Sequence, residues 1–121
     1  MPEKNVFKKI IDGEIPCHKI YEDDNFLAFL DIHPEAPGHT LIIPKEEVRW
    51  VWDVELYSEY WELARTIAHN LQKTFNTEMI ICKIVGEEVP HAHIKLFPAI
   101  EKDGTETDFK MIAEKIKKAL V

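Results

Sequence analysis

Two histidines and a lysine stand at alternating positions in the segment 89–98. A β-strand projects successive side chains to opposite faces, so His91, His93 and Lys95 share one face of the strand that this alternation predicts. The positions between and after them are apolar: Ala92, Ile94, Leu96 and Pro98. A row of imidazoles and an ammonium on one face, with an apolar row toward the core, predicts a functional site.

The chemistry open to this histidine pair is broad. Near neutral pH an imidazole acts as a base, an acid, a nucleophile or a metal ligand. A chelating pair would suit a metal, with Glu87, Glu88 and His39 as candidate further ligands. A nucleophilic histidine instead needs one tautomer held by an acceptor, and positive charge such as Lys95 or backbone N–H groups near Gly86. A solvated pair without function is the third interpretation, and periodicity does not choose among them.

Two polar residues stand at the ends of other predicted strands. Asp31 ends the otherwise apolar segment 26–32, where a turn residue and a ligand-binding carboxylate are both plausible interpretations. His39 opens the strand predicted over 39–44, after a loop containing two prolines and a glycine. Both residues are therefore candidates for the same site.

The order of the predicted elements indicates an α+β fold. Helical spacing of apolar residues predicts helices over 5–12, 58–76 and 108–120. Strands are expected over 18–21, 26–32, 39–44, 77–85 and 89–98, several joined as hairpins. This order predicts one domain over 1–121: an antiparallel sheet of about five strands, with a long helix and a C-terminal helix packed on one side of it. The tryptophan-rich segment 46–56 is expected to be a lid or a turn of helix.

Composition excludes several classes of partner. The net charge of −7 argues against a nucleic-acid backbone or an anionic membrane surface as the main partner. No run of apolar residues approaches the ~20 that span a bilayer. Cys17 and Cys82 form no CxxC motif, and such sparse cysteine suits a reducing cytoplasm. We therefore expect a cytoplasmic protein.

Four blocks of the sequence resemble the histidine triad (HIT) family, specifically its Hint-like branch. They span 6–16, 21–32, 34–45 and 86–93, so the resemblance covers nearly the whole chain. It implies a homodimer, formed through the long helix and the 77–85 strand. It also implies binding of a purine nucleotide and cleavage at its α-phosphorus, for example in a nucleoside phosphoramidate, with neither a cofactor nor a metal.

The resemblance also implies roles for individual residues. His93 would attack the phosphorus and hold the nucleotide covalently, His91 would support it, and His39 would lie alongside. Asp31 matches the residue that binds the ribose hydroxyls. Gly86 and Glu88 belong to the implied nucleotide site. The positions that match the wall of the base pocket are apolar: Val6, Phe7, Ile10, Ile15, Phe29 and Ile32.

The departures from the family pattern concentrate in this implied site. Lys95 replaces the third histidine, and a lysine is a poor proton shuttle at pH 7. Glu87 and Glu88 replace a glutamine and a small or hydroxyl residue, so they would repel a phosphate. An asparagine that contacts the ribose corresponds to one of two isoleucines, Ile80 or Ile81. The zinc ligands of some members are replaced by other residues: Asn5, Lys8 and Glu47.

Two functions follow from the resemblance and its departures. The first is a HIT hydrolase or nucleotidyl transferase that works through a nucleotidyl-histidine. The second is a catalytically weak or inactive nucleotide-binding or interaction protein on the same fold.

Overall fold

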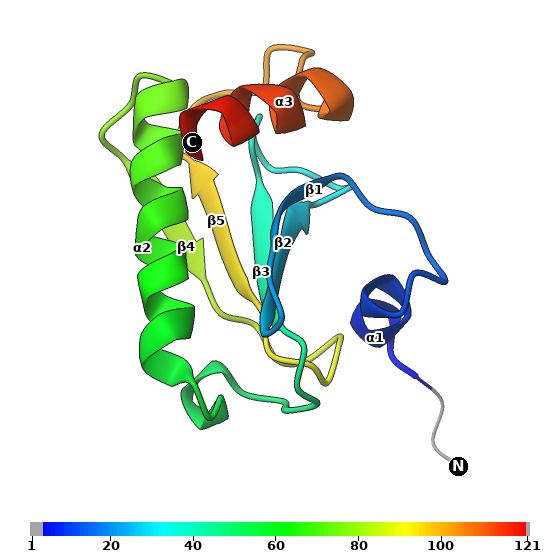
Figure 1. The fold of residues 1–121 in the computed structure, drawn as a ribbon. Coiled ribbons are helices and arrows are strands. Elements are labelled where there is room, and N and C mark those ends of the chain that lie inside the picture. The colour runs from blue at the N-terminus through cyan, green and yellow to red at the C-terminus, as the bar shows by residue number, and fades with distance from the viewer. Residues whose placement is uncertain (1–3, 121) are drawn as a thin grey trace.

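A five-stranded antiparallel sheet forms the centre of the protein (Figure 1). The structure is a computed structural model that describes residues 4–120, so the ends of the predicted 1–121 span lie outside it. The strands follow the spatial order β1-β2-β3-β5-β4, and every neighbouring pair is antiparallel. Their bounds are β1 (Lys19–Glu22), β2 (Phe26–Leu30), β3 (Thr40–Pro44), β4 (Ile80–Lys83) and β5 (Ile94–Pro98). The predicted α+β class is confirmed.

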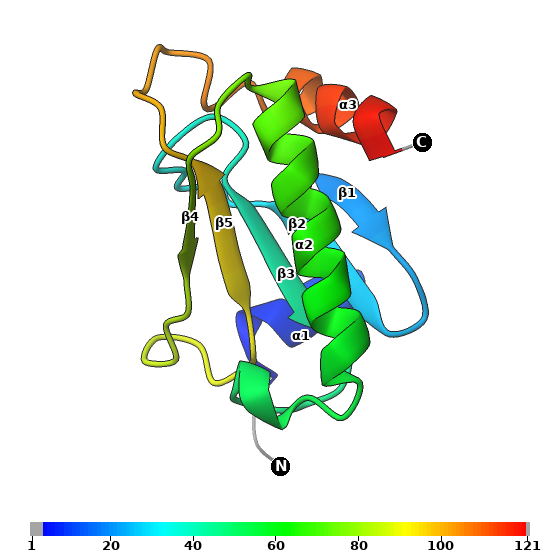
Figure 2. The same cartoon turned by 90° about the vertical axis from the view of Figure 1, so that its left-hand side faces the viewer.

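Helices cover both faces of the sheet, which differs from the predicted one-sided arrangement. The long helix α2 (Tyr57–Thr74) and the C-terminal helix α3 (Phe109–Leu120) pack on one face, as predicted. The short helix α1 (Val6–Ile11) lies on the opposite face (Figures 1 and 2). The reason is the composition of β2, whose five residues are all buried and therefore need cover on both sides. No helix within residues 4–120 is long and apolar enough to cross a membrane.

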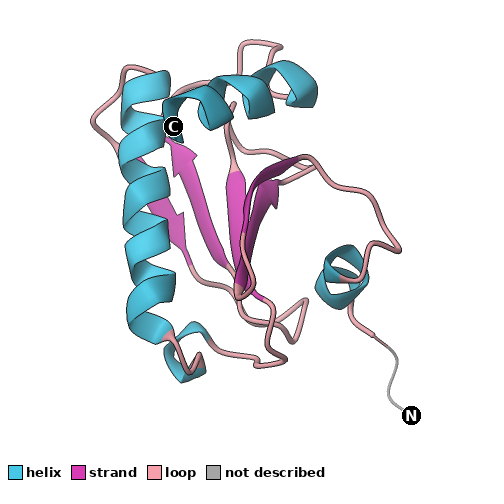
Figure 3. Cartoon of the chain, in the orientation of Figure 1, coloured by secondary structure: helices cyan, strands magenta, loops and turns pink. Residues whose placement is uncertain are grey.

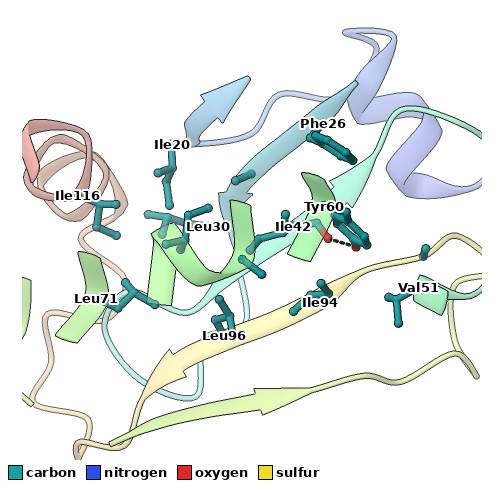
Figure 4. Packing of buried hydrophobic residues seen from close by; sticks show 14 of the residues in the cluster. Ile20, Phe26, Leu30, Ile42, Val51, Tyr60, Leu71, Ile94, Leu96 and Ile116 are labelled. Atoms are coloured by element: carbon teal, nitrogen blue, oxygen red, sulfur yellow. Dashed lines mark hydrogen bonds between the residues drawn. The ribbon is translucent and has the colours of Figure 1, made fainter. Parts of the chain in front are cut away.

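Two apolar clusters hold these layers together. The larger one lies between the sheet and helices α2 and α3, and it receives Ala28 and Leu30 from β2. Within it the Tyr60 hydroxyl donates a hydrogen bond of 2.6 Å to the Ile42 carbonyl (Figure 4). The smaller cluster lies beneath α1 and receives the alternate β2 residues, Leu27 and Phe29. The period-2 alternation of β2 thus contributes to both clusters.

The segment before β5 is a loop, and the predicted strand over 89–98 is wrong for its first half. Regular pairing begins only at Ile94, and residues 84–93 connect β4 to β5 without strand structure (Figure 3). The backbone there pairs elsewhere: the Ala92 N–H donates to the Val48 carbonyl at 2.7 Å. The Arg49 side chain donates to the Gly86 carbonyl at 2.8 Å. The segment after β3, and not strand β4, therefore makes the hydrogen bonds that hold this loop.

The tryptophan-rich segment contains a single 3-10 turn, η1 (Val51–Asp53), rather than a lid. Its Val51 side chain is buried in the larger cluster, whereas Trp52 is 61% exposed. Trp50 stacks on Trp52 with 5.0 Å between ring centroids. The Trp50 ring also covers Gly86, so that a β-carbon at that position would lie 2.3 Å from the ring. Glycine at position 86 is therefore a steric requirement of this contact.

Candidate functional site

A cavity of about 330 Å³ opens on the α1 face of the sheet. Helix α1, the end of β2, the loop before β5 and β5 itself contribute its walls. It brings together most of the residues predicted for the site: Phe7, Ile10, Ile15, Phe29, Asp31, Ile32, Glu88, His93 and Lys95. His91, His39 and Gly86 do not line it. The predicted site is thus divided into residues that line the cavity and residues that do not.

His93 presents one ring nitrogen to this cavity. Its Nδ1 lies 2.8 Å from the His91 carbonyl oxygen. Because a carbonyl only accepts, Nδ1 carries the hydrogen in the neutral ring and Nε2 keeps its lone pair. Within residues 4–120, Nε2 has no hydrogen-bond partner, and it is not among the fully buried polar atoms. Burial lowers the pKa of His93, and the nearby Lys95 charge lowers it further, so the ring stays neutral at pH 7.

His91 lies behind His93 and does not reach the cavity. Its side chain is 1% exposed, and its Nε2 donates to the Pro44 carbonyl at 2.8 Å. Its Nδ1 lies 3.4 Å from the Nδ2 atom of Asn5, the residue that caps α1. Burial lowers the pKa of His91, with the Pro44 hydrogen bond acting in the opposite direction. His91 is therefore a neutral, fully enclosed support.

His39 is the third buried histidine and lies next to Asp31. Its Nδ1 accepts a hydrogen bond of 3.0 Å from the Glu35 N–H, so its Nε2 carries the hydrogen. That Nε2 atom is buried without a partner, 3.6 Å from the Asp31 carboxylate, which is beyond hydrogen-bond length. Burial lowers the pKa of His39, and Asp31 opposes the shift. A small movement of Asp31 would complete this hydrogen bond.

Asp31 makes a turn contact and also lines the cavity. One carboxylate oxygen accepts the His33 N–H at 2.8 Å, which is a turn contact. The side chain is only 16% exposed and also lines the cavity. Its backbone N–H donates to the His39 carbonyl at 2.9 Å, which ties the end of β2 to the start of β3. One oxygen of the carboxylate is thus anchored at the cavity wall by the His33 N–H.

The apolar wall of the cavity is partly core and partly open. Phe7, Ile10 and Phe29 are buried in the smaller cluster, and the Phe7 and Phe29 rings meet edge to face at 6.0 Å. Ile32, in contrast, is 63% exposed, and Val6 is 41% exposed. Apolar side chains left open at a cavity mouth are suited to contact a flat apolar ligand.

The charges along the cavity are of both signs. Lys95 is the only lysine or arginine among its lining residues, and the lining carboxylates are Asp31 and Glu88. Glu87 is exposed and does not line it. Lys95 pairs in register with Lys83 on β4, and the Lys83 ammonium bonds to the Glu35 carboxylate at 3.1 Å. Glu35 therefore offsets the repulsion between the two lysines, and Lys95 lines the cavity.

The structure gives no support to the metal interpretation of the histidine pair. Within residues 4–120, no group of three or more His, Cys, Asp or Glu side chains is placed to hold a metal ion. His91 and His93 each use a ring nitrogen on a backbone carbonyl. The candidate ligands Glu87, Glu88 and His39 do not join them in such a group.

Some lining residues were not identified from the sequence. Pro16, Cys17, Leu41, Val85 and Val89 also face the cavity. Cys17, Val85 and Val89 belong to loops, whose orientation no periodicity reveals. Leu41 could have been found, because its alternation with buried Ile42 in β3 places it on the α1 face with Ile43.

Comparisons with known proteins agree with the fold. The family model of the HIT domain matches residues 12–102. An uncharacterized HIT-like protein of Methanocaldococcus jannaschii is 37% identical over 110 residues, which cover 86% of this chain and 85% of that protein. The adenosine 5'-monophosphoramidase of Saccharomyces cerevisiae is 36% identical over 126 residues, which cover 95% of this chain and 80% of that protein. The crystal structure of a HIT-like protein from Bartonella henselae, described as involved in cell-cycle regulation, superposes with a TM-score of 0.84 at 34% identity and 98% coverage of both chains. This chain is a member of the HIT family.

Proposed function

We propose that this protein is a purine-nucleotide hydrolase or nucleotidyl transferase of the Hint-like branch. Its substrate would be a nucleoside phosphoramidate or a related conjugate, cleaved at the α-phosphorus. The yeast relative, a monophosphoramidase that is 36% identical, supports this substrate class. The cavity of about 330 Å³, with an apolar wall and a few polar groups, has the character of a small-molecule site.

The main observation behind the proposal is the state of His93. Its Nδ1–H is held by the His91 carbonyl, and its Nε2 lone pair is left for the cavity. A neutral imidazole in one tautomer is a competent nucleophile at pH 7. The ring is also fixed edge-on against Phe7, 4.9 Å between centroids, so that little orientational freedom remains to be lost in the reaction.

In the proposed reaction, His93 Nε2 attacks the α-phosphorus of the bound conjugate. A bond forms between Nε2 and phosphorus, and the bond between phosphorus and the leaving amine breaks. The Lys95 ammonium would stabilise the phosphoryl oxygens and give the departing amine its proton, since Lys95 lines the cavity. Water or another acceptor then attacks the phosphorus and gives its proton to the Lys95 amine. The bond between phosphorus and Nε2 breaks, which releases the nucleotide and restores the neutral ring.

The other lining residues would bind the nucleotide. Phe7 and Phe29, with Ile10, Ile15 and Ile32, would enclose the purine. The Asp31 carboxylate would accept hydrogen bonds from the ribose hydroxyls, since Asp31 lines the cavity and a carboxylate has more acceptor sites than its bond from the His33 N–H uses. Glu88 would lie near the phosphate, and Gly86 would act indirectly through the loop that it allows.

A second candidate function is nucleotide binding without efficient turnover. Two lining residues favour this function. Lys95 corresponds to the third histidine of the family pattern, and Glu88 adds a carboxylate to the cavity wall. A lysine delivers its proton less readily than a histidine at pH 7, and a carboxylate repels phosphate.

The proposal includes a homodimer of single-domain chains in the cytoplasm. Strand β4 lies at the edge of the sheet, with one side open to pairing. Apolar side chains flank it on the surface, where Met79 is 64% exposed and Ile84 is 37% exposed. The thiols of Cys17 and Cys82 are free, which suits a reducing compartment.

A comparison of wild type with His93→Ala tests the choice between the two functions. Both proteins are given a fluorogenic adenosine phosphoramidate, and nucleotide affinity is measured in parallel. We expect turnover to fall about 10³-fold or more in the variant while binding persists, because only the nucleophile is lost. His69→Ala, on the exposed side of α2, is the control. Equal rates for wild type and His93→Ala, with nucleotide still bound, would establish the second function.

A further inference from the structure

We propose that Asn5 is a positioning residue for the histidine pair. Its side-chain amide holds His91 in one neutral tautomer, and the His91 backbone in turn orients the His93 ring. The inference concerns the architecture behind the cavity, and it rests on the proposed function only in naming His93 as the nucleophile. Asn5 itself does not line the cavity.

The orientation of the Asn5 amide follows from its place at the start of α1. Asn5 has an extended backbone (φ −71°, ψ 169°), and its Oδ1 accepts the Lys8 N–H at 2.9 Å. This is the hydrogen bond of an N-cap residue. Because Oδ1 is occupied by a donor, the amide cannot rotate by half a turn without losing the cap. Its Nδ2 group therefore points to His91 Nδ1, at 3.4 Å.

His91 is complementary to this donor. Its Nε2 lies 2.8 Å from the Pro44 carbonyl, which only accepts, so Nε2 carries the hydrogen. Nδ1 is then the lone-pair nitrogen, the partner that an amide N–H needs. Protonation at Nδ1 would set two donors against each other inside a nearly fully buried pocket. The Pro44 carbonyl thus fixes the hydrogen on Nε2, and the Asn5 amide holds His91 in this neutral form by opposing a second proton on Nδ1.

The same contacts extend to His93. The His91 carbonyl accepts the His93 Nδ1–H, so a shift of the His91 backbone moves the proposed nucleophile. Phe7, two residues after Asn5, packs edge-on against both imidazoles. The distance between ring centroids is 6.1 Å to His91 and 4.9 Å to His93. Helix α1 therefore both forms the cavity wall and, through Asn5 and Phe7, holds the two rings.

The charged groups around His91 do not by themselves fix its state. Lys8 on α1 opposes protonation of His91, whereas Glu47, in the segment after β3, favours it. His93 is neutral and offers no charge. Burial has the largest effect and lowers the pKa of His91, while the hydrogen bond to the Pro44 carbonyl raises it. The Asn5 amide, a donor facing Nδ1, favours the same neutral form as burial does.

The substitution Asn5→Asp separates positioning from simple helix capping. Aspartate caps a helix as well as asparagine does, but it replaces the donor toward His91 by an acceptor. We expect the pKa of His91, measured by NMR titration, to rise by about 1–2 units, because a carboxylate beside an imidazole favours its charged form. Lys9→Gln makes the same change in net charge on exposed α1 surface and should leave the titration unchanged.

Two further measurements test the state of His91 directly. In the wild type, nitrogen chemical shifts should identify His91 as the Nε2–H tautomer. In Asn5→Ser, which keeps a cap but lacks the amide, the Pro44 carbonyl should retain that tautomer, and the pKa of His91 should rise because no amide donor opposes a proton on Nδ1. A titration of His91 that is equal in Asn5→Asp and Lys9→Gln, or an Nδ1–H tautomer in the wild type, would overturn the proposal. These spectra need no turnover. An inactive wild type with the expected His91 signals would therefore refute the proposed reaction and leave the positioning role intact.

Discussion

At the scale of single residues, the site depends on three histidines that are buried rather than solvated. His39, His91 and His93 are each at most 5% exposed, and each bonds to a backbone group through Nδ1 or Nε2. A buried imidazole without such partners would be costly, so these bonds are what allow the rings to be enclosed. The alternation in the sequence correctly placed His93 and Lys95 on one face, but it did not indicate that α1 covers that face.

Among the residues that depart from the family pattern, Lys95 should affect the turnover rate most. Lys95→His should raise phosphoramidate turnover by about tenfold or more, because an imidazole transfers protons near pH 7 more readily than an ammonium does. Lys83→His is the matched control, since Lys83 is the in-register neighbour on β4 and does not line the cavity. Steady-state rates of the three proteins test this. An unchanged rate in Lys95→His would direct attention to Glu88 instead.

At the scale of elements, helices were predictable and the loop before the histidines was not. The apolar spacing over 58–76 closely anticipated α2 (Tyr57–Thr74), since helical periodicity is local. Residues 89–93 alternate as a strand does, yet their backbone bonds to the segment after β3. The contacts of Val48 and Arg49 with this loop join distant parts of the chain, and no local pattern encodes them.

The packing of Trp50 on Gly86 should therefore control the shape of this loop. Gly86→Ala places a β-carbon 2.3 Å from the Trp50 ring, so one of the two must move. We expect the free energy of unfolding to fall by about 1–3 kcal/mol, the usual cost of overpacking. Trp50→Ala removes the obstacle, and Gly86→Ala should cost clearly less in that background. Urea unfolding of the four proteins measures this coupling. Additive effects would show that the contact does not constrain the loop.

At the scale of the whole molecule, the fold was predictable because its strands and helices follow simple sequence patterns. The packing of helices on both faces of the sheet was not predictable. Helix α1 has only six residues, and its apolar side chains fit either a core or a ligand pocket. Phe7 and Ile10 in fact serve both, being buried in the smaller cluster and lining the cavity. The sequence positions of the cavity wall were therefore largely foreseen, although their dual use was not.

The three buried histidines also make the stability of the whole protein depend on pH. Burial lowers the pKa of His39, His91 and His93 in the folded state, so the unfolded chain binds protons at a higher pH than the folded chain does. The free energy of unfolding should be at its full value above about pH 6.5 and fall as the pH drops below it, by up to about 1.4 kcal/mol per pH unit for each histidine.

Urea midpoints between pH 7.5 and 5.5 measure this dependence. His69→Gln, which changes an exposed residue of α2, should show the same slope as the wild type. His39→Asn should show a smaller slope, since one of the titrating groups is gone. A midpoint that stays constant through this range in the wild type would mean that the buried rings do not titrate differently on unfolding.

The most direct test of the proposed reaction is to trap its covalent intermediate. The protein is mixed with an adenosine phosphoramidate, denatured rapidly at alkaline pH, which spares the acid-labile bond between phosphorus and nitrogen, and digested for mass spectrometry. The proposal predicts one adenylyl group on the peptide that contains His93, located on that residue and absent from His93→Ala. Turnover without any adduct, or an adduct on another residue that persists in His93→Ala, would contradict it.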